Sequence, residues 1–295
     1  MLNSEIAERL STTFECFFKH SIKHFVEDPL EHEDKIQCIF SLQEALELLL
    51  KFYIVEKMGY RFIIEDSQAD KPEDELQSLL DQGKLKTIGF GKALSLLKNS
   101  DECPIFEDDF DLIKDFQEAR NQIAHMGYKT FPNTLLNGIF RLITSVFSDL
   151  EYLDHGDGPD LFNALKFKLG DDLYRQFTSN KELREAAEDK ADDVTDDVHH
   201  CLECGARTVL DDNEPYGYYK CILCGYKIGK YYASIIKCPS CETNNLYFDT
   251  LNISPSNDVN GHCSCCGATV VVSQCKECGD YYVYGLGKCS CDMED

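Results

Sequence analysis

The chain has 295 residues, 43% of them hydrophobic, which is enough for about two domains and a well-filled core. Its formal net charge is −24, spread along the whole sequence, and this field disfavours non-specific clamping of duplex nucleic acid. No segment reaches the roughly 18 to 20 apolar residues of a membrane span, and the N-terminus lacks a secretory pattern, so we expect a soluble, cytoplasmic protein with no membrane partner.

The first half of the chain has apolar residues at helical spacing. Long helices are predicted at 6–25, 36–60, 106–127 and 133–153, and a shorter helix is predicted at 91–99, after the polar stretch 65–75. Residues 1–154 are therefore predicted to form an all-helical bundle.

The next segment, 155–198, connects this bundle to a region of different composition. "DHGDGPD" at 154–160 is a turn-rich break, and 161–177 have the pattern of a further helix. The run "KELREAAEDKADDVTDDVHH" that follows is either a charged linker or a solvated helix, and its charge favours the linker. We therefore predict a helical and acidic linker over 155–198.

Cysteine placement indicates metal binding in the last third of the chain. Thirteen of the 16 cysteines follow residue 200, mostly as pairs with two residues between them, which favours metal over disulfides in a chain without an export signal. Two such pairs at hairpin tips can close a tetrahedral zinc site with no position left for water, so we expect structural metals, about three zinc ions per chain. The predicted ligand sets are Cys201, Cys204, Cys221 and Cys224; Cys238, Cys241, Cys263 and Cys266; and Cys275, Cys278, Cys289 and Cys291.

Two of these sets depart from the regular pattern. Cys265 competes as a ligand in the second set, and only one residue separates Cys289 from Cys291 in the third. Glycine follows the second cysteine of four pairs, where a left-handed turn exposes amide groups toward the thiolates, but Glu242 replaces it in the fifth. The glycines are Gly205, Gly225, Gly267 and Gly279.

The paired cysteines and glycines resemble zinc ribbons. The resemblance implies small β modules at 199–232 and 233–272, and a third ribbon or knuckle at 273–295. Six tyrosines surround the first set, and they could either stack on unpaired bases or only cover the metal-held hairpin. They are Tyr216, Tyr218, Tyr219, Tyr226, Tyr231 and Tyr232.

An arginine interrupts the apolar stripe of the helix predicted at 106–127. On a helical wheel, Phe110, Ile113 and Phe116 define the buried stripe, and Arg120 falls inside it. A buried guanidinium needs an acidic companion, a cleft or an interface, because burying it alone is expensive. His125 lies about 140° further around the helix, so the two side chains converge only if the helix ends or bends near His125, or if two copies meet across a twofold axis.

"RNQIAH" at 120–125, together with the earlier segment "SLQEALELLLKFYIVE", resembles the HEPN family over residues 5–152. In its ribonuclease members an arginine, four to six residues and a histidine end the third core helix. The resemblance implies that Arg120 contacts the scissile phosphate, that His125 transfers protons as an RNA 2′-hydroxyl attacks, and that Asn121 is the accompanying polar residue. It also implies a homodimer with a composite site. Tyr128 does not match the longer histidine–tyrosine form of some relatives.

The predicted architecture is thus multidomain, an N-terminal all-α HEPN-like bundle followed by small β zinc-ribbon modules. The function that the resemblance implies is a metal-independent endoribonuclease acting in defence or as a toxin. Its ribbons would contact single-stranded or structured RNA locally, or a regulatory protein partner. The alternative is a non-catalytic dimeric scaffold whose ribbons bind protein or nucleic acid. In that alternative Arg120 pairs with Glu44 or Glu47, and His125 only caps its helix.

Overall fold

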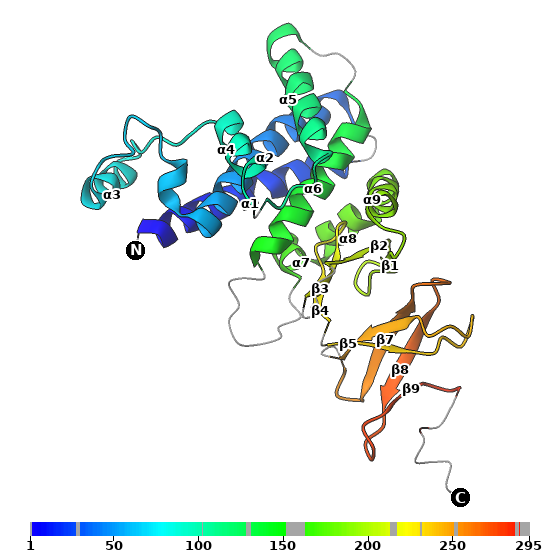
Figure 1. Ribbon diagram of the computed structural model, residues 1–295. Helices are drawn as coiled ribbons and strands as arrows, with labels where there is room; N and C mark the ends of the chain where they lie inside the picture. Colours follow the sequence, from blue (N-terminus) through cyan, green and yellow to red (C-terminus); the bar gives the residue numbers. More distant parts are fainter. Residues whose placement is uncertain are drawn as a thin grey trace, which may run out of the picture. The chain divides into compact units, whose positions relative to one another are not determined.

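The computed structural model describes residues 2–27, 30–101, 103–127, 131–151, 163–212, 217–230, 232–250, 253–286 and 289. The chain forms two compact units, Met1–Asp154 with Lys168–Phe177, and His155–Phe167 with Thr178–Asp295. The predicted division into a helical N-terminal region and a C-terminal region of antiparallel sheets is confirmed (Figure 1). The break predicted at 154–160 lies outside the described residues. No helix among the described residues has the length and apolar character needed to cross a bilayer.

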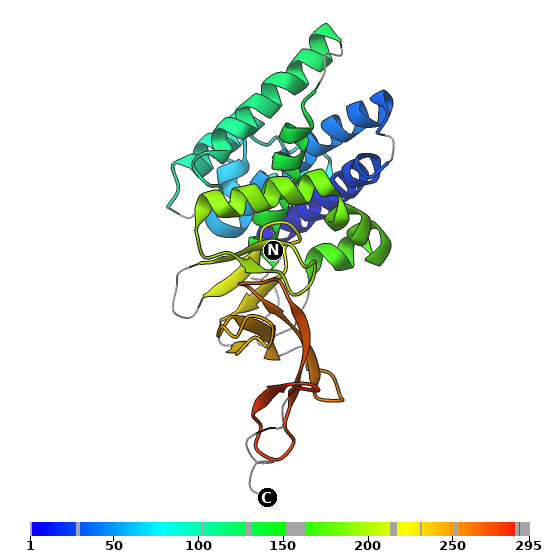
Figure 2. The same ribbon diagram turned by 90° about the vertical axis from the view of Figure 1, so that its right-hand side faces the viewer.

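The first unit is built on two long helices. In both views α1 (Leu2–Phe25) and α2 (His32–Met58) lie side by side (Figures 1 and 2). The sequence did not predict α3, which begins inside the polar stretch 65–75 and buries only Leu76. The other elements are η1 (Tyr60–Ile63), α3 (Glu73–Asp81), α4 (Phe90–Lys98), α5 (Asp109–Met126), α6 (Asn133–Glu151) and α8 (Asp171–Ser179), with α7 (Ala164–Leu169) ending in this unit.

Aromatic side chains at helical spacing join α1 to α6 and α8. Phe14 and Phe18 lie one turn apart on α1 and are buried. The Phe14 ring centroid lies 5.1 Å from that of Phe147, and Phe25 lies 4.5 Å from Phe140. Phe177 of α8 completes the cluster, with its centroid 5.5 Å from Phe140. Such aromatic contacts contribute more than their buried area alone, so this cluster is the centre of the helical core.

Two contacts fix α5 against α6. The Arg141 guanidinium forms an ion pair with Asp109, the first residue of α5, and both side chains are buried. At Gly138 the helices approach closely, because a Cβ there would lie 2.8 Å from the Leu112 Cδ2 atom. These contacts hold the first turns of α5, and Arg120 lies further along the same helix.

The acidic run after Asn180 forms a helix, which is the alternative that its charge had disfavoured. Asn180 caps α9 (Lys181–Val194) by accepting a hydrogen bond from the Leu183 backbone N–H. Leu183, Ala187 and Ala191 are buried at four-residue spacing on one side of α9. The high charge of the run obscured this narrow apolar stripe, which provides the packing that a solvated linker lacks.

The rest of the second unit consists of two antiparallel sheets. The first has the strand order β1-β2-β3-β4 and the second the order β5-β6-β7-β8-β9, so every strand pairs with its neighbour in sequence. The core of the second sheet contains Leu246, Phe248, Val259 and Val272 beside buried cysteines. The strands are β1 (His199–His200), β2 (Arg207–Asp211), β3 (Tyr218–Cys221), β4 (Lys227–Gly229), β5 (Ala233–Ile236), β6 (Leu246–Asp249), β7 (Asp258–Cys263), β8 (Thr269–Gln274) and β9 (Tyr281–Val283).

Candidate functional site

Five cysteine knuckles share one backbone hydrogen-bond pattern. In each knuckle the N–H of the first cysteine donates to the carbonyl five residues later, and its carbonyl accepts from the N–H four residues later, with donor–acceptor distances of 2.8–3.0 Å. The residue four positions on has a φ between 59° and 80°. It is the predicted glycine in four knuckles and Glu242 in the fifth. The knuckles begin at Cys201, Cys221, Cys238, Cys263 and Cys275.

In the part of the chain that the structure describes, three groups of cysteines lie close enough together to hold a metal ion each. Within each group all Sγ atoms lie within 4.8 Å of one another. In each of the first two groups, two Sγ–Sγ pairs lie 3.5 to 3.8 Å apart. Four sulfurs at about 2.3 Å from a tetrahedral zinc ion would be about 3.8 Å apart, whereas a disulfide requires about 2.05 Å. The donor geometry therefore fits a tetrahedral thiolate-bound metal. The groups are Cys201, Cys204, Cys221 and Cys224; Cys238, Cys241, Cys263 and Cys266; and Cys275, Cys278 and Cys289.

The structure distinguishes Cys265 from Cys266 as a member of the second group, and it describes three of the four cysteines predicted for the third. Cys266 belongs to the second group, whereas its neighbour Cys265 is exposed and lies outside it. In the third group the Cys278 and Cys289 Sγ atoms are 3.3 Å apart. Cys291, the predicted fourth ligand of this group, lies outside the described residues.

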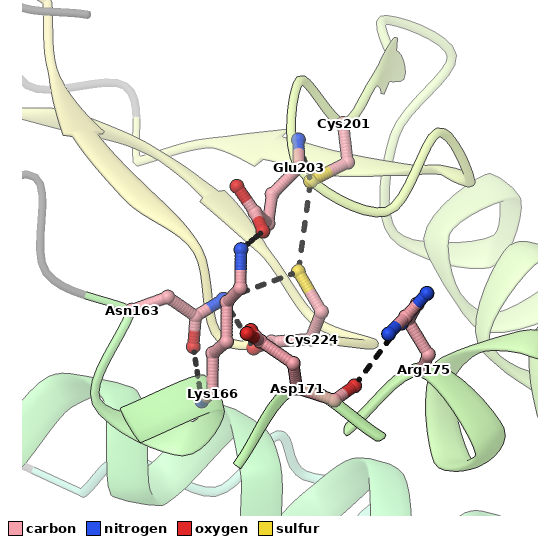
Figure 3. Close-up of polar contacts among 7 residues, drawn as sticks. All are labelled: Asn163, Lys166, Asp171, Arg175, Cys201, Glu203 and Cys224. Atoms are coloured by element: carbon pink, nitrogen blue, oxygen red, sulfur yellow. Dashed lines mark hydrogen bonds and ion pairs between the residues drawn. The ribbon is translucent and has the colours of Figure 1, made fainter. Parts of the chain in front are cut away.

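Polar groups around the first set are aimed at its sulfurs. The Thr208 hydroxyl lies 3.0 Å from the Cys221 Sγ atom. The Asn163 side-chain amide donates to the Cys224 carbonyl at 3.2 Å and lies 3.9 Å from the Cys224 Sγ atom (Figure 3). Lys166, one turn later, forms an ion pair with Glu203 at 2.6 Å (Figure 3). Hydrogen bonds of this kind orient thiolate ligands and tune their basicity.

Nothing in the sequence around Asn163 indicates a role at a metal site. Its local role is to cap α7, because its Oδ1 atom accepts from the Lys166 backbone N–H at 3.1 Å. A capping asparagine before an apolar turn is recognisable in a sequence, but its contact with a cysteine 61 residues away depends on the tertiary fold. Arg184 of α9 is a similar case, since it donates to the Cys204 carbonyl at 3.1 Å.

The protein environment shifts the pKa values of Cys201 in the first set and Cys241 in the second. Burial raises the pKa of Cys201, because ionisation would place a charge in a desolvated site. Hydrogen bonds from the hydroxyl and backbone of Thr243 lower the pKa of Cys241 to about 6. Each group contains buried cysteines, and four neighbouring thiolates repel one another, so a divalent cation supplies the compensation that allows them to ionise together.

The tyrosines around the first set are mainly packing residues where the structure describes them. Tyr226 is buried, and its hydroxyl donates to the buried Asp249 carboxylate. The Tyr219 ring lies 5.3 Å from His199 and 5.8 Å from Tyr247, between centroids. These contacts join the two sheets of the second unit. Tyr216 and Tyr231 lie outside the described residues, and half-buried Tyr218 is covered by the Lys227 Nζ atom, 4.0 Å from its ring centroid.

Arg120, on the helical unit, is held without an acidic partner. Its guanidinium carbon lies 5.2 Å from the centroid of the Phe40 ring, and its Nη1 atom donates to the Asn121 Oδ1 atom at 3.1 Å. Its Nε atom is buried and has no hydrogen-bond partner. Among the described residues no carboxylate forms an ion pair with Arg120. Glu47, one of the two partners considered, instead accepts from Lys51 at 2.7 Å, and Glu44 is exposed.

His125 and Asn121 are exposed on the last turns of α5. The helix continues through Met126 and stops at Gly127, where φ is 79°. Because His125 follows Arg120 by five residues on a continuous helix, their side chains point about 140° apart. The structure thus places both residues at one end of α5, but one copy of the chain does not bring them together. Tyr128 lies outside the described residues.

The two candidate sites offer different chemistry. The cysteine groups supply closed sets of soft sulfur donors, whereas Arg120 supplies an unpaired cation suited to an anion such as a phosphate. Comparison of the chain with protein-family models, with curated proteins and with solved structures finds no match.

Proposed function

We propose that the chain is a HEPN-type endoribonuclease whose arginine and histidine act in a site completed by a second copy. The observation that carries the proposal is the Arg120 guanidinium, which is half-buried on Phe40 with no carboxylate beside it among the described residues. A cation held in this way is stabilised by an incoming anion, and a planar guanidinium suits the two oxygens of a phosphodiester.

In this mechanism Arg120 binds the scissile phosphate and stabilises the charge that develops on it. His125 transfers protons as the RNA 2′-hydroxyl attacks that phosphate, which leaves a cyclic phosphate at the new 3′ end. Asn121 keeps the guanidinium oriented through its bond to the Nη1 atom. No metal takes part in these steps.

A homodimer follows from the direction of the two side chains. On the continuous helix α5 they point about 140° apart, so Arg120 of one protomer and His125 of the other would face the same phosphate across a twofold axis. The strongly acidic chain repels RNA at long range, so binding would be confined to this local site and to contacts made by the second unit.

The cysteine groups would be zinc ribbons in the same proposal. Sulfur spacing close to that of a tetrahedral zinc site supports this identity for the first two groups, and the third would be completed by Cys291. These ions would be structural, about three per chain, and would hold a module that positions RNA or a regulatory protein. The setting we propose, on the resemblance alone, is defence or toxin activity.

The test is cleavage of end-labelled RNA by the purified chain. His125→Ala should lower the cleavage rate by about 10²- to 10⁴-fold, the usual contribution of a general acid or base. Gln122→Ala removes an exposed neighbour on the same turn and should cleave like the wild type. The new 3′ ends should carry cyclic phosphate, and cleavage should persist in a chelator as long as the second unit stays folded. Unchanged cleavage by His125→Ala would refute the assignment.

A non-catalytic dimeric scaffold is the second candidate, and the net charge of −24 favours it because that charge opposes binding to any polyanion. It predicts no cleavage by the wild type. It also predicts that Arg120→Ala alters dimerisation, measured by sedimentation, while leaving binding of a protein partner by the second unit intact. The cleavage assay therefore separates the two candidates.

A further inference from the structure

Two histidines near the end of α1 form a group of metal-binding side chains outside the cysteine sets. His20 and His24 are four residues apart on the continuous helix Leu2–Phe25, so they lie on the same face. Their ring centroids are 4.6 Å apart and their planes are nearly perpendicular, at 85°. His20 is exposed, and the His24 side chain is 24% exposed, so a solvated ion can reach both rings.

Asp34, in the first turn of α2, sets the orientation of the second ring. The His24 Nδ1 atom lies 2.8 Å from the Asp34 Oδ1 atom. A carboxylate accepts hydrogen bonds, so this contact assigns the ring proton to Nδ1 and leaves Nε2 as the lone-pair donor. Histidines that bind metals commonly have this arrangement, with a carboxylate behind the ring that raises its basicity.

The charge around the pair also favours a cation. Four described residues between the end of α1 and the first turn of α2 are acidic, namely Glu27, Glu31, Glu33 and Asp34. Lys19, Lys23 and Lys35 are the nearby opposing charges in the sequence. Lys19 donates to the Lys168 carbonyl at 3.1 Å, and Lys35 donates to Asn133 at 2.7 Å. A divalent ion would meet several carboxylates beside the two imidazoles.

We propose that His20 and His24 bind a divalent transition-metal ion such as Zn²⁺ through their Nε2 atoms, with water in the remaining positions and Asp34 as the supporting carboxylate. Imidazole is a suitable ligand for this class of ion. With only two protein ligands the ion exchanges with solvent, unlike an ion held by four buried thiolates. Its binding would clamp the last turn of α1. The proposal is independent of the ribonuclease assignment.

The test is a zinc titration of the full chain. The protein is loaded with zinc, freed of unbound metal and titrated with Zn²⁺ against a chromophoric chelator. We expect one further zinc ion per chain, beyond those that the cysteines retain. His20→Ala should weaken this binding by about tenfold or more, and Asp34→Asn should weaken it by about 10- to 100-fold, the usual effect of losing a carboxylate behind a ligating histidine.

His125→Ala is the matched control, because it removes another exposed imidazole from the same helical unit. Its affinity for the additional zinc ion should equal that of the wild type. His20 is exposed, so its replacement should preserve the helical circular-dichroism signal, and lost binding would not reflect unfolding. The proposal is overturned if the zinc-loaded chain binds no additional zinc, or if His20→Ala binds it as tightly as the wild type.

Discussion

The cysteine knuckles and the last turns of α5 both present reactive side chains, but contacts at different ranges fix their geometry. Each knuckle is closed by backbone bonds within six residues, so the local sequence determines its shape. Arg120 instead depends on Phe40, 80 residues earlier in the chain, and in our proposal on a second protomer. A site built from local turns can be predicted from spacing alone, whereas one built from a helix face cannot.

The largest effect expected from our proposal that the knuckles hold structural zinc is that of removing this metal. Structural zinc in small modules contributes apparent binding free energies of about 10 to 16 kcal/mol, which is more than a small sheet gains from its own core. Stripping zinc under mild conditions should therefore abolish the strand signal in circular dichroism, while the helical signal of the first unit persists. If the sheets stay folded after complete metal removal, the knuckles do not need a metal ion to fold.

Cys265 and Cys266 provide a matched pair for the same experiment. Cys266→Ser removes a sulfur from the second group, so we expect one zinc fewer per chain by elemental analysis. Cys265→Ser alters the exposed neighbour outside that group and should leave the zinc content unchanged. Equal zinc loss in both variants would mean that the two cysteines exchange as ligands.

Substitutions of two arginines test whether Arg120 contributes to the stability of the helical unit. Arg141→Met removes one partner of the buried ion pair with Asp109, and breaking such a pair typically costs about 3 to 5 kcal/mol. Arg120→Met removes a guanidinium that has no carboxylate partner among the described residues. It should change the free energy of unfolding by less than about 1 kcal/mol. The substitution loses the contact with Phe40, but it also removes the Nε atom, which is buried without a hydrogen-bond partner and therefore destabilises the fold.

Urea unfolding, monitored by the helical circular-dichroism signal, measures the free energy of unfolding of both variants. If Arg120→Met were as destabilising as Arg141→Met, Arg120 would be a structural residue, and this result would favour the non-catalytic scaffold over the ribonuclease. In the ribonuclease proposal Arg120→Met keeps its stability and loses RNA cleavage, which is the signature of a residue retained for function rather than packing.

The sequence predicted the parts of the fold whose signals are local. Apolar periodicity located the long helices, and cysteine and glycine spacing located the five knuckles. The single helix predicted at 161–177 is interrupted at Gly170, where φ is 79°, and forms α7 and α8. Two other helices, α3 and α9, were missed or disfavoured for a common reason. In α3 only Leu76 is buried, and α9 buries leucine and alanines within a highly charged run, so neither has a broad apolar stripe.

At the candidate sites, the contacts that could not be predicted from the sequence are those between residues far apart in the chain. The helical wheel placed Arg120 on the buried side of α5, but it could not identify Phe40 as the surface on which the guanidinium stacks. The contact between Asn163 and Cys224 was equally inaccessible, because it depends on how α7 meets the first knuckle pair. Long-range contacts of polar side chains leave no periodic signal in a sequence.

Asn163 therefore allows a test of a distant contact within the cysteine region. Asn163→Ala removes the donor to the Cys224 carbonyl and sulfur, and losing such a supporting bond typically weakens metal binding by about 10- to 100-fold. Zinc competition on the full chain should show this loss at one site only. Lys166→Ala breaks the neighbouring half-buried pair with Glu203, which does not contact a sulfur, and should have less than about a tenth of that effect.

The smallest expected effects test whether the knuckles are locally determined. Gly205 has a φ of 72°, and a Cβ there would meet no atom within 4 Å, so Gly205→Ala adds only backbone strain, about 1 to 2 kcal/mol. Glu242 occupies the equivalent position with a φ of 59°. Glu242→Gly should therefore stabilise the second unit by about 1 kcal/mol, since its exposed contact with Lys237 contributes little. Opposite signs in thermal unfolding would show that the same turn conformation controls both knuckles. A destabilised Glu242→Gly variant would mean that contacts beyond the turn select glutamate there.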